Sequence, residues 1–278
     1  MQCAVLMSGT GSNAVALLEY EHQTPDCPYH VAALITDAPE ASNTRSIAEK
    51  YNLPWAACDI RKFYAERGEN STRLDSPRRC RIRDEWSAEL LKIIRCFQVD
   101  FLLFAGFTSL TNLASEIPCL NVHPGDLTRC DENGNRIYAG LHILPVEKAL
   151  LNGDKFLRSS VILVQPYTGN DSKETDAGPI IGVSAPVSID FEGYTVAELQ
   201  RIKDSRVPGA RCSDTLRSMA LKHIEKLKND GDHVVFPRAA ADFAAGAFTF
   251  GNSGFCYKGT RVITVEYPGT TPPVPITC

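Results

Sequence analysis

The sequence predicts a doubly wound, mostly parallel α/β sheet, and three observations lead to this fold class. Short apolar runs of strand length alternate with segments of helical periodicity through the first half of the chain. A glycine-rich turn over residues 8–13 separates the first apolar run from a helical segment. The chain has 278 residues, which is enough to bury a full α/β core. We therefore expect one α/β domain over residues 1–266 and a proline-rich tail over residues 267–278.

The elements of the first half follow from the spacing of the apolar residues. The run Gln2–Met7 is short and apolar, which predicts a strand, and the apolar density from Ala14 onward predicts a helix. The same criteria predict strands over residues 30–36, 54–58, 99–105 and 119–122, and helices over residues 42–51 and 83–96. The charged segment 61–81 shows no periodicity, so we expect a surface excursion there.

The second half is expected to complete the sheet and then to continue mainly as helices. Strands are predicted over residues 159–165 and 180–187, and helices over residues 141–151, 195–203, 213–228 and 234–245. A small hairpin is expected to turn through residues 251–254. Polar stretches indicate insertions near residues 60–81, 126–138, 166–175 and 191–231.

Composition and charge narrow the classes of function. Hydrophobic residues make up 44% and charged residues 22% of the chain, which is typical of a globular protein and not of a disordered one. The net charge of -4 lacks the basic surplus that a nucleic-acid partner requires. No apolar run reaches membrane-spanning length, so we expect a cytoplasmic protein without a membrane partner. The ten cysteines are scattered and form no CxxC pair, so we expect neither a disulfide framework nor a metal site.

The glycine-rich turn is a candidate anion site. Gly11, Ser12 and Asn13 lie between a strand and the start of a helix, where free N–H groups and the helix dipole favour a phosphate. A second interpretation stays open at this point. Gly9, Gly11 and Ala14 also satisfy a dinucleotide-binding pattern, and Asp37 follows the second strand where a ribose-binding acid is expected.

A second candidate site lies at the end of the strand predicted over residues 119–122. Open α/β sheets place their ligands at the carboxyl ends of strands, where His123 stands. Asn121 is two residues earlier, so both side chains point to the same side of an extended segment. An amide and an imidazole can therefore converge on one reacting atom.

Six short motifs follow one another along the chain: Ser8-Gly-Thr-Gly-Ser-Asn13, Phe104-Ala-Gly-Phe107, Asn121-Val-His-Pro124, Tyr138-Ala-Gly-Leu-His142, Asn152-Gly-Asp154 and Asp176-Ala-Gly-Pro-Ile180. In this order they resemble the glycinamide ribonucleotide formyltransferase family. The C-terminal segment Asp232-His-Val-Val-Phe-Pro237 is similar to the acidic-His-x-x-aromatic-Pro segment of that family's last long helix. Several spaced motifs are more specific than any one of them, and they span most of residues 1–266.

The resemblance implies a Rossmann-like fold and assigns roles to individual residues. It implies that Asn121, His123 and Asp176 are catalytic, and that Gly11, Ser12 and Asn13 bind the phosphate of the acceptor. Further residues are implied to lie at the site: His142 and Asp232 on the acceptor side, and Arg83 and Phe107 on the side of the donor. The implied donor is 10-formyltetrahydrofolate, the implied acceptor is glycinamide ribonucleotide in purine biosynthesis, and no metal is implied.

The chemistry of formyl transfer suits these residue types. An amine attacks the formyl carbon, and negative charge builds on the formyl oxygen of the tetrahedral intermediate. Asn121 and a protonated His123 would donate hydrogen bonds to that oxygen. Asp176 would pair with His123 and accept the proton of the amine, directly or through water.

The sequence departs from the family pattern on the donor side. The family usually carries an arginine after the position of Phe107, where this chain has Thr108-Ser109, and a family histidine is replaced within Leu157-Arg-Ser-Ser-Val-Ile162. The insertions also leave the acceptor amine open. Two alternatives therefore remain beside formyl transfer: a nicotinamide-dependent oxidoreductase that uses the glycine turn, and a non-catalytic nucleotide-binding relative. A homodimer is left open as well.

Overall fold

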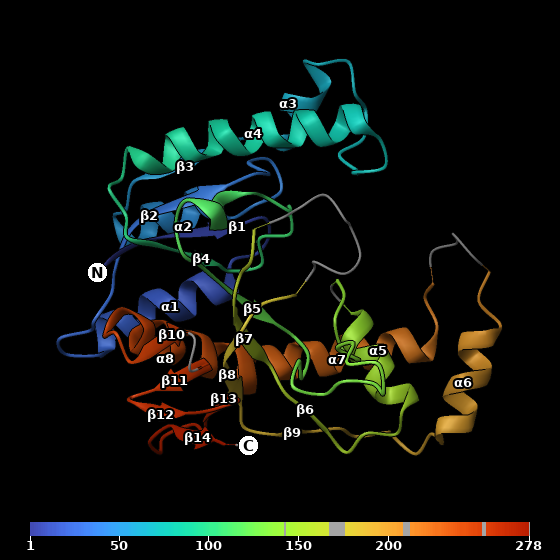
Figure 1. Ribbon diagram of the computed structural model, residues 1–278. Coiled ribbons are helices and arrows are strands. Elements are labelled where there is room, and N and C mark those ends of the chain that lie inside the picture. The colour runs from blue at the N-terminus through green and yellow to red at the C-terminus, as the bar shows by residue number, and fades with distance from the viewer. Residues whose placement is uncertain (142, 167–175, 208–211, 252–253, 278) are drawn as a thin grey trace.

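The predicted fold class is confirmed by the computed structural model, which describes residues 1–141, 143–166, 176–207, 212–251 and 254–277 (Figure 1). Its centre is a nine-stranded sheet in the order β14-β13-β8-β7-β5-β4-β1-β2-β3, in which β7 and β14 run against the other strands. The strands are β1 (Gln2–Met7), β2 (His30–Thr36), β3 (Trp55–Ala57), β4 (Phe101–Phe104), β5 (Cys119–His123), β7 (Ser160–Leu163), β8 (Ile180–Ser184), β13 (Thr264–Tyr267) and β14 (Val274–Ile276).

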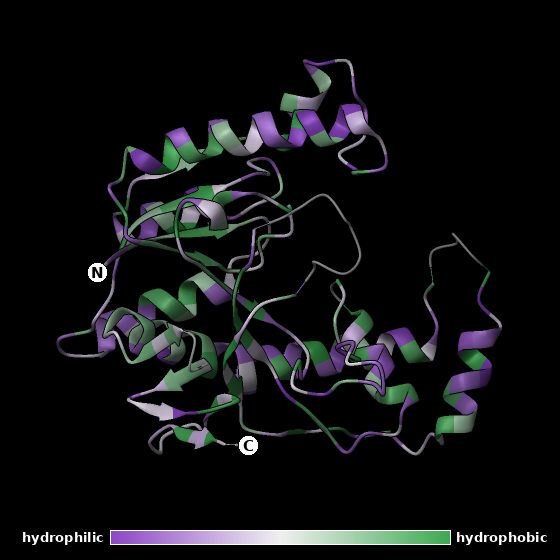
Figure 2. Cartoon of the chain, viewed as in Figure 1, coloured by the Kyte–Doolittle hydropathy of each residue, from purple (hydrophilic) through white to green (hydrophobic). Residues whose placement is uncertain are grey.

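Helices cover both faces of this sheet, as a doubly wound fold requires. On one face α4 (Pro77–Arg95) buries Trp86, Leu90 and Ile94 against β1 and β4, beside the short α3 (Ile60–Ala65). On the other face lie α1 (Ser12–Gln23), α2 (Thr44–Tyr51) and α8 (His233–Ala244). Figure 2 shows hydrophilic and hydrophobic residues interleaved along α4, as expected for a helix with one buried side.

A third cluster of apolar residues lies beside the sheet. It is built by α5 (Leu144–Leu151), α6 (Val196–Asp204) and α7 (Thr215–Leu227), together with the two-stranded pair β6 (Phe156–Leu157) and β9 (Val187–Ser188). A π-helical turn, η2 (Lys228–Asp232), joins α7 directly to α8. Asp232 at the end of this turn lines the same cavity as Asn121 and His123 of β5.

Two sequence expectations were wrong. The segment 61–81 is not patternless, because α3 begins at Ile60 and α4 begins at Pro77, six residues before the predicted start. The second difference concerns residues 274–276, which we expected in a tail. They form β14, the edge strand of the main sheet, through its antiparallel pairing with β13. The expected hairpin is present as β10 (Phe248–Gly251) and β11 (Gly254–Tyr257), extended by β12 (Thr260–Arg261).

Within the described part of the chain, no helix combines the length and the apolar character that crossing a membrane requires.

Candidate active site

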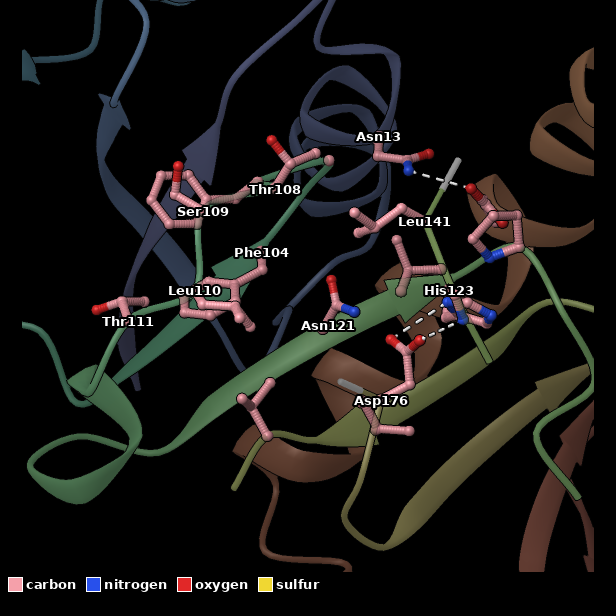
Figure 3. Close-up of a pocket in the computed structure, with 18 of the residues that line it drawn as sticks. Asn13, Phe104, Thr108, Ser109, Leu110, Thr111, Asn121, His123, Leu141 and Asp176 are labelled. Atoms are coloured by element: carbon pink, nitrogen blue, oxygen red, sulfur yellow. Dashed lines mark hydrogen bonds and ion pairs between the residues drawn. The ribbon is translucent and has the colours of Figure 1, made fainter. Parts of the chain in front are cut away.

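A cavity of about 250 Å³ opens at the carboxyl ends of β4 and β5 (Figure 3). Its walls come from the loop after β4, the end of β5, the segment before α5 and the loop that precedes β8. Asn121, His123 and Asp176 all line this cavity, and Figure 3 shows their side chains gathered around one part of it. The structure therefore brings together the three residues that the sequence predicts to be catalytic.

His123 is almost fully buried and has an acceptor at each ring nitrogen. Its Nδ1 atom lies 3.3 Å from Oδ1 of Asp176, and its Nε2 atom lies 2.7 Å from the main-chain carbonyl oxygen of Tyr138. A neutral imidazole has only one N–H group, so it cannot donate to both acceptors. The ring is thus held from both sides, by the Asp176 carboxylate and the Tyr138 carbonyl.

Asp176 has a backbone and an environment that hold its carboxylate in place. Its φ of 62° is in the left-handed region, which is uncommon for a residue other than glycine. Burial alone would raise the pKa of Asp176, but the hydrogen bond and the charge of His123, the Gly140 N–H group and Arg136 together lower it. The Gly140 N–H group donates to Oδ2 of Asp176 at 3.0 Å. Asp176 therefore faces His123 as a carboxylate.

Asn121 reaches the cavity because of its position in the sheet. It lies on β5 opposite Phe104 of β4 and Ile162 of β7, two residues before His123. The period of two in an extended strand predicts that both side chains face one side, and both line the cavity. The amide thus faces the same space as the imidazole (Figure 3).

The glycine turn lies between this cavity and a second hollow. Gly11 precedes α1 with a φ of 79°, and a Cβ atom there would lie 2.4 Å from the Met7 side chain, so only glycine fits. No side chain caps the start of α1, which leaves its first N–H groups available for an anion. Ser12 lines the second hollow and Asn13 lines the main cavity, whereas Gly11 lines neither.

Asp232 is 4% exposed and lines the cavity near Asn13. Its Oδ2 atom accepts from Nδ2 of Asn13 at 3.1 Å, and its Oδ1 atom accepts from Oγ of Ser159 at 2.5 Å. Burial raises the pKa of Asp232 even though both hydrogen bonds oppose this effect. The expected role of Asp232 toward ribose hydroxyls stays a prediction.

Lys228 also lines the cavity, and the sequence analysis did not select it. It stands one turn before Asp232 in η2, and its Nζ atom lies 2.5 Å from Oε1 of Glu225. Its spacing from Asp232 was the available signal, because residues about one helical turn apart share a face. Lys228 therefore adds a cationic side chain, paired with Glu225, to the lining of the cavity.

The opposite wall is built by the loop after β4. Phe107 lines the cavity and stacks on Trp86 at a centroid distance of 6.3 Å. Thr108, Ser109, Leu110 and Thr111 continue the wall. Oγ of Ser109 donates to Oδ2 of Asp37 at 2.5 Å, and Asp37 is buried.

Arg83 does not fit the role toward the donor that we expected. It is 4% exposed and lies outside the lining of the cavity. Its guanidinium donates to the carbonyl oxygens of Leu110 at 2.9 Å and Thr72 at 2.6 Å. Arg83 therefore holds the loop after β4, which forms one wall of the cavity. His142 lies outside the described residues, whereas its neighbour Leu141 lines the cavity.

The described residues include no group of three or more His, Cys, Asp or Glu side chains that could hold a metal ion.

Comparisons with known proteins were made by sequence and by structure. No protein-family model and no curated protein matches the sequence. The structure is similar to the phosphoribosylglycinamide formyltransferase of Coxiella burnetii solved with CHES, with a TM-score of 0.63 and 21% identity over 96% of this chain and 99% of that chain. The same enzyme of Anaplasma phagocytophilum has a TM-score of 0.60 and 20% identity, over 96% and 98% of the two chains. The fold is that of these formyltransferases.

A third similar structure is a formyltetrahydrofolate deformylase from Pseudomonas syringae pv. tomato. It has a TM-score of 0.60 and 15% identity, and the match covers 92% of this chain and 65% of that chain. Enzymes with two different reactions thus share this architecture. The distinction between their reactions must therefore be argued from the site.

Proposed function

We propose that this protein transfers a formyl group from 10-formyltetrahydrofolate to the amine of a phosphorylated small molecule, with glycinamide ribonucleotide as the acceptor. One observation carries this proposal. Asn121, His123 and Asp176 come from two separate segments of the chain and face a single cavity, whose lining also includes Asn13 and Lys228. A reacting carbon in this cavity would have both hydrogen-bond donors for the oxyanion and groups that bind an anion within the same space.

The residues of the site account for each change of charge in the reaction. The amine nitrogen bonds to the formyl carbon, and the carbonyl π electrons move to the oxygen, which becomes negative. Asn121 donates a hydrogen bond to this oxygen, and a protonated His123 donates to it by exchanging the Nε2 hydrogen bond to the Tyr138 carbonyl for the oxyanion. Asp176 accepts the proton that the attacking amine must lose, directly or through water, and its lowered pKa keeps it ionised for this task. Collapse of the intermediate breaks the bond between the carbon and the folate nitrogen, which takes up a proton.

The acceptor is inferred to be phosphorylated because of the glycine turn. The uncapped start of α1 offers N–H groups and the positive end of a helix dipole, and both favour a phosphate. Lys228 adds a nearby cation. The names of the two similar formyltransferases make a phosphoribosylglycinamide the acceptor to test first.

The donor side suits a flat, largely apolar group. Phe104, Leu110, Ile162 and Val164 line that part of the cavity, so a pterin ring would bury apolar surface against them. Thr108 and Ser109 offer neutral hydroxyl groups where the family usually has an arginine. We expect the glutamate tail of the folate to contribute less to binding here than in the family.

The oxidoreductase alternative fits the geometry less well. Its ribose-binding acid, Asp37, is buried and accepts a hydrogen bond from Ser109. Neither Asp37 nor Gly9 nor Ala14 lines the main cavity. A nicotinamide enzyme also gives no reason for the pairing of His123 with Asp176.

The test is formyl transfer from 10-formyltetrahydrofolate to glycinamide ribonucleotide, followed by release of tetrahydrofolate. We expect turnover by the parent protein and a loss of about 10³-fold in kcat for His123→Ala, because the oxyanion loses a charged donor. A folded parent protein without turnover would refute the proposal for this acceptor. Release of formate without an acceptor would instead indicate deformylation. A cytoplasmic location and a homodimer stay predictions.

A further inference from the structure

The loop over residues 126–138 contacts both members of the His123–Asp176 pair. Its C-terminal end supplies the Tyr138 carbonyl oxygen that faces Nε2 of His123. Gly140, two residues later, supplies the N–H group that donates to Asp176. Sequence analysis marked residues 126–138 as a polar insertion and connected only the motif that begins at Tyr138 with the site, so a role for Arg136 was not expected.

The loop has a defined shape that presents Arg136 to the site. Cys130 and Arg136 form an isolated antiparallel bridge, and the Ile137 N–H group donates to the Arg129 carbonyl at 3.0 Å. The turn between them is closed by the Asp131 carboxylate, which accepts from the N–H groups of Asn133 at 2.9 Å and Asn135 at 2.8 Å. Arg136 therefore lies at the end of a short hairpin that is held by its own hydrogen bonds.

Arg136 spans the turn that carries Asp176. Its Nη1 atom donates to the main-chain carbonyl oxygen of Asp176, and its Nη2 atom donates to that of Gly178 at 2.5 Å. Both residues have a positive φ, 62° for Asp176 and 115° for Gly178. A backbone in this region is held only when its surroundings fix it. The guanidinium fork matches two carbonyl groups of one turn, which a single ammonium cannot do.

The partners of this guanidinium indicate that it acts on the backbone. Burial lowers the pKa of Arg136, and Cys130 and Asp176 only partly offset this effect, so the cation is kept in the site at a cost. The described ion pairs include none at Arg136, and Asp176 pairs with His123 instead. Arg136, half-buried against two main-chain carbonyl groups, therefore orients the backbone of this turn and forms no salt bridge among the described residues.

We propose that Arg136 is a positioning residue that holds the Asp176 turn so that its carboxylate faces His123. This inference rests on the proposed formyl transfer for its kinetic test. Without the fork, the turn is free to relax from its left-handed backbone, and the carboxylate moves relative to Nδ1 of His123. A displacement of about 1 Å in a catalytic group costs roughly 10²-fold in rate.

The kinetic experiment compares Arg136→Ala with Arg238→Ala. Arg238 is a matched control, because its guanidinium also clamps main-chain carbonyls, those of Pro268, Gly269 and Thr271, away from the cavity. We expect kcat to fall about 10- to 100-fold in Arg136→Ala with the KM of the acceptor changed less than about threefold, and parent kcat in Arg238→Ala. Millimolar guanidinium ion should restore part of the Arg136→Ala rate, whereas Arg136→Lys should stay slow. An equal loss in both alanine variants, or a change in KM alone, would overturn the proposal.

A second readout does not depend on any activity. Among the described residues, the charged or titratable groups around the Asp176 carboxylate are His123 on β5 and Arg136 on the loop, and Asp232 on η2 interacts with His123 from elsewhere in the site. A carbon-13 NMR titration of the Asp176 carboxyl, assigned with Asp176→Asn, should give a higher pKa in both Arg136→Ala and Arg136→Lys than in Arg238→Ala. An unchanged pKa in Arg136→Lys would refute the positioning role. This holds even if the parent protein shows no formyl transfer, so the two failures are distinguishable.

Discussion

Two buried carboxylates interact with His123, and their surroundings shift their pKa values in opposite directions. Burial penalises the charge of both Asp176 and Asp232. Asp176 has the His123 ring at 3.3 Å and Arg136 nearby, and its pKa is lowered. Asp232 accepts from the amide of Asn13 and the hydroxyl of Ser159, and its pKa is raised.

The difference shows what decides the protonation of a buried acid. Two neutral hydrogen bonds do not outweigh the loss of hydration at Asp232, whereas the charge and hydrogen bond of His123, with the Gly140 N–H group, do so at Asp176. Two acids with opposite shifts around one imidazole suggest two different tasks. We assign the proton-accepting task to Asp176 and a role in holding Asn13 to Asp232.

The largest expected effect is a difference in kcat between variants of the two acids. Asp176→Asn should lower kcat by about 10²- to 10⁴-fold, because the site loses its proton acceptor and the partner of His123. Asp232→Asn should lower kcat by roughly tenfold or less, because its amide oxygen can still accept from Asn13. Steady-state kinetics of both variants provide the measurement. Equal losses of kcat in the two variants would show that the two acids do not have different roles in the reaction.

The two acids should affect the stability of the fold in different pH ranges. The pKa of Asp176 is lowered by folding, so its stabilisation is present above the unfolded value of about 3.9 and is lost as pH falls through the folded pKa. The pKa of Asp232 is raised, so its contribution is fully present below about 3.9 and is lost as pH rises through the folded pKa. A tenfold change in proton affinity corresponds to about 1.4 kcal/mol.

Thermal unfolding of the two asparagine variants tests these windows. Relative to the parent, the deficit of Asp176→Asn should shrink as pH falls below about 4, because only the parent then loses stability. The Tm of Asp232→Asn should improve relative to the parent as pH rises above about 4. At this chain length a change of 1 kcal/mol moves the Tm by roughly 2–4 °C. Parallel curves for both variants would contradict the opposite shifts.

Much of the fold could be predicted because the sheet is made of continuous apolar runs. The predicted bounds of the strands Gln2–Met7 and His30–Thr36 match the structure. The prediction for residues 61–81 was wrong because the charged residues there show no helical periodicity, although α3 begins at Ile60 and α4 begins at Pro77. Asp59 accepts from two N–H groups of α3, and Ser76 caps α4 just before Pro77, so capping signals were present where periodicity was not.

The candidate site could be predicted where one strand or one motif carries it. Asn121 and His123 share a face of β5 by the period of two, and Asp176 was found only through the resemblance. Arg136 and Arg83 could not be assigned from sequence, because their partners are main-chain carbonyls. Such contacts leave no pattern in residue type, and those of Arg136 join positions 40 residues apart.

The smallest expected effect concerns the neutral donor to Asp232. Ser159→Ala removes the hydroxyl that donates to Oδ1 at 2.5 Å, which should raise the pKa of Asp232 further and destabilise the fold by about 1–3 kcal/mol at neutral pH. The His123–Asp176 pair is not in contact with this hydroxyl, so kcat should change less than about fivefold, which is a smaller effect than the loss of one hydrogen bond to a charged group would produce. Ser160→Ala is a matched control, because Ser160 is the next residue, the first of β7, and donates to the Gly125 carbonyl at 2.7 Å. If both variants lose equal stability but only Ser159→Ala moves the pKa of Asp232, the hydroxyl tunes that acid specifically. If Ser159→Ala lowers kcat as strongly as Asp176→Asn, Asp232 shares the catalytic task and the division between the two acids fails.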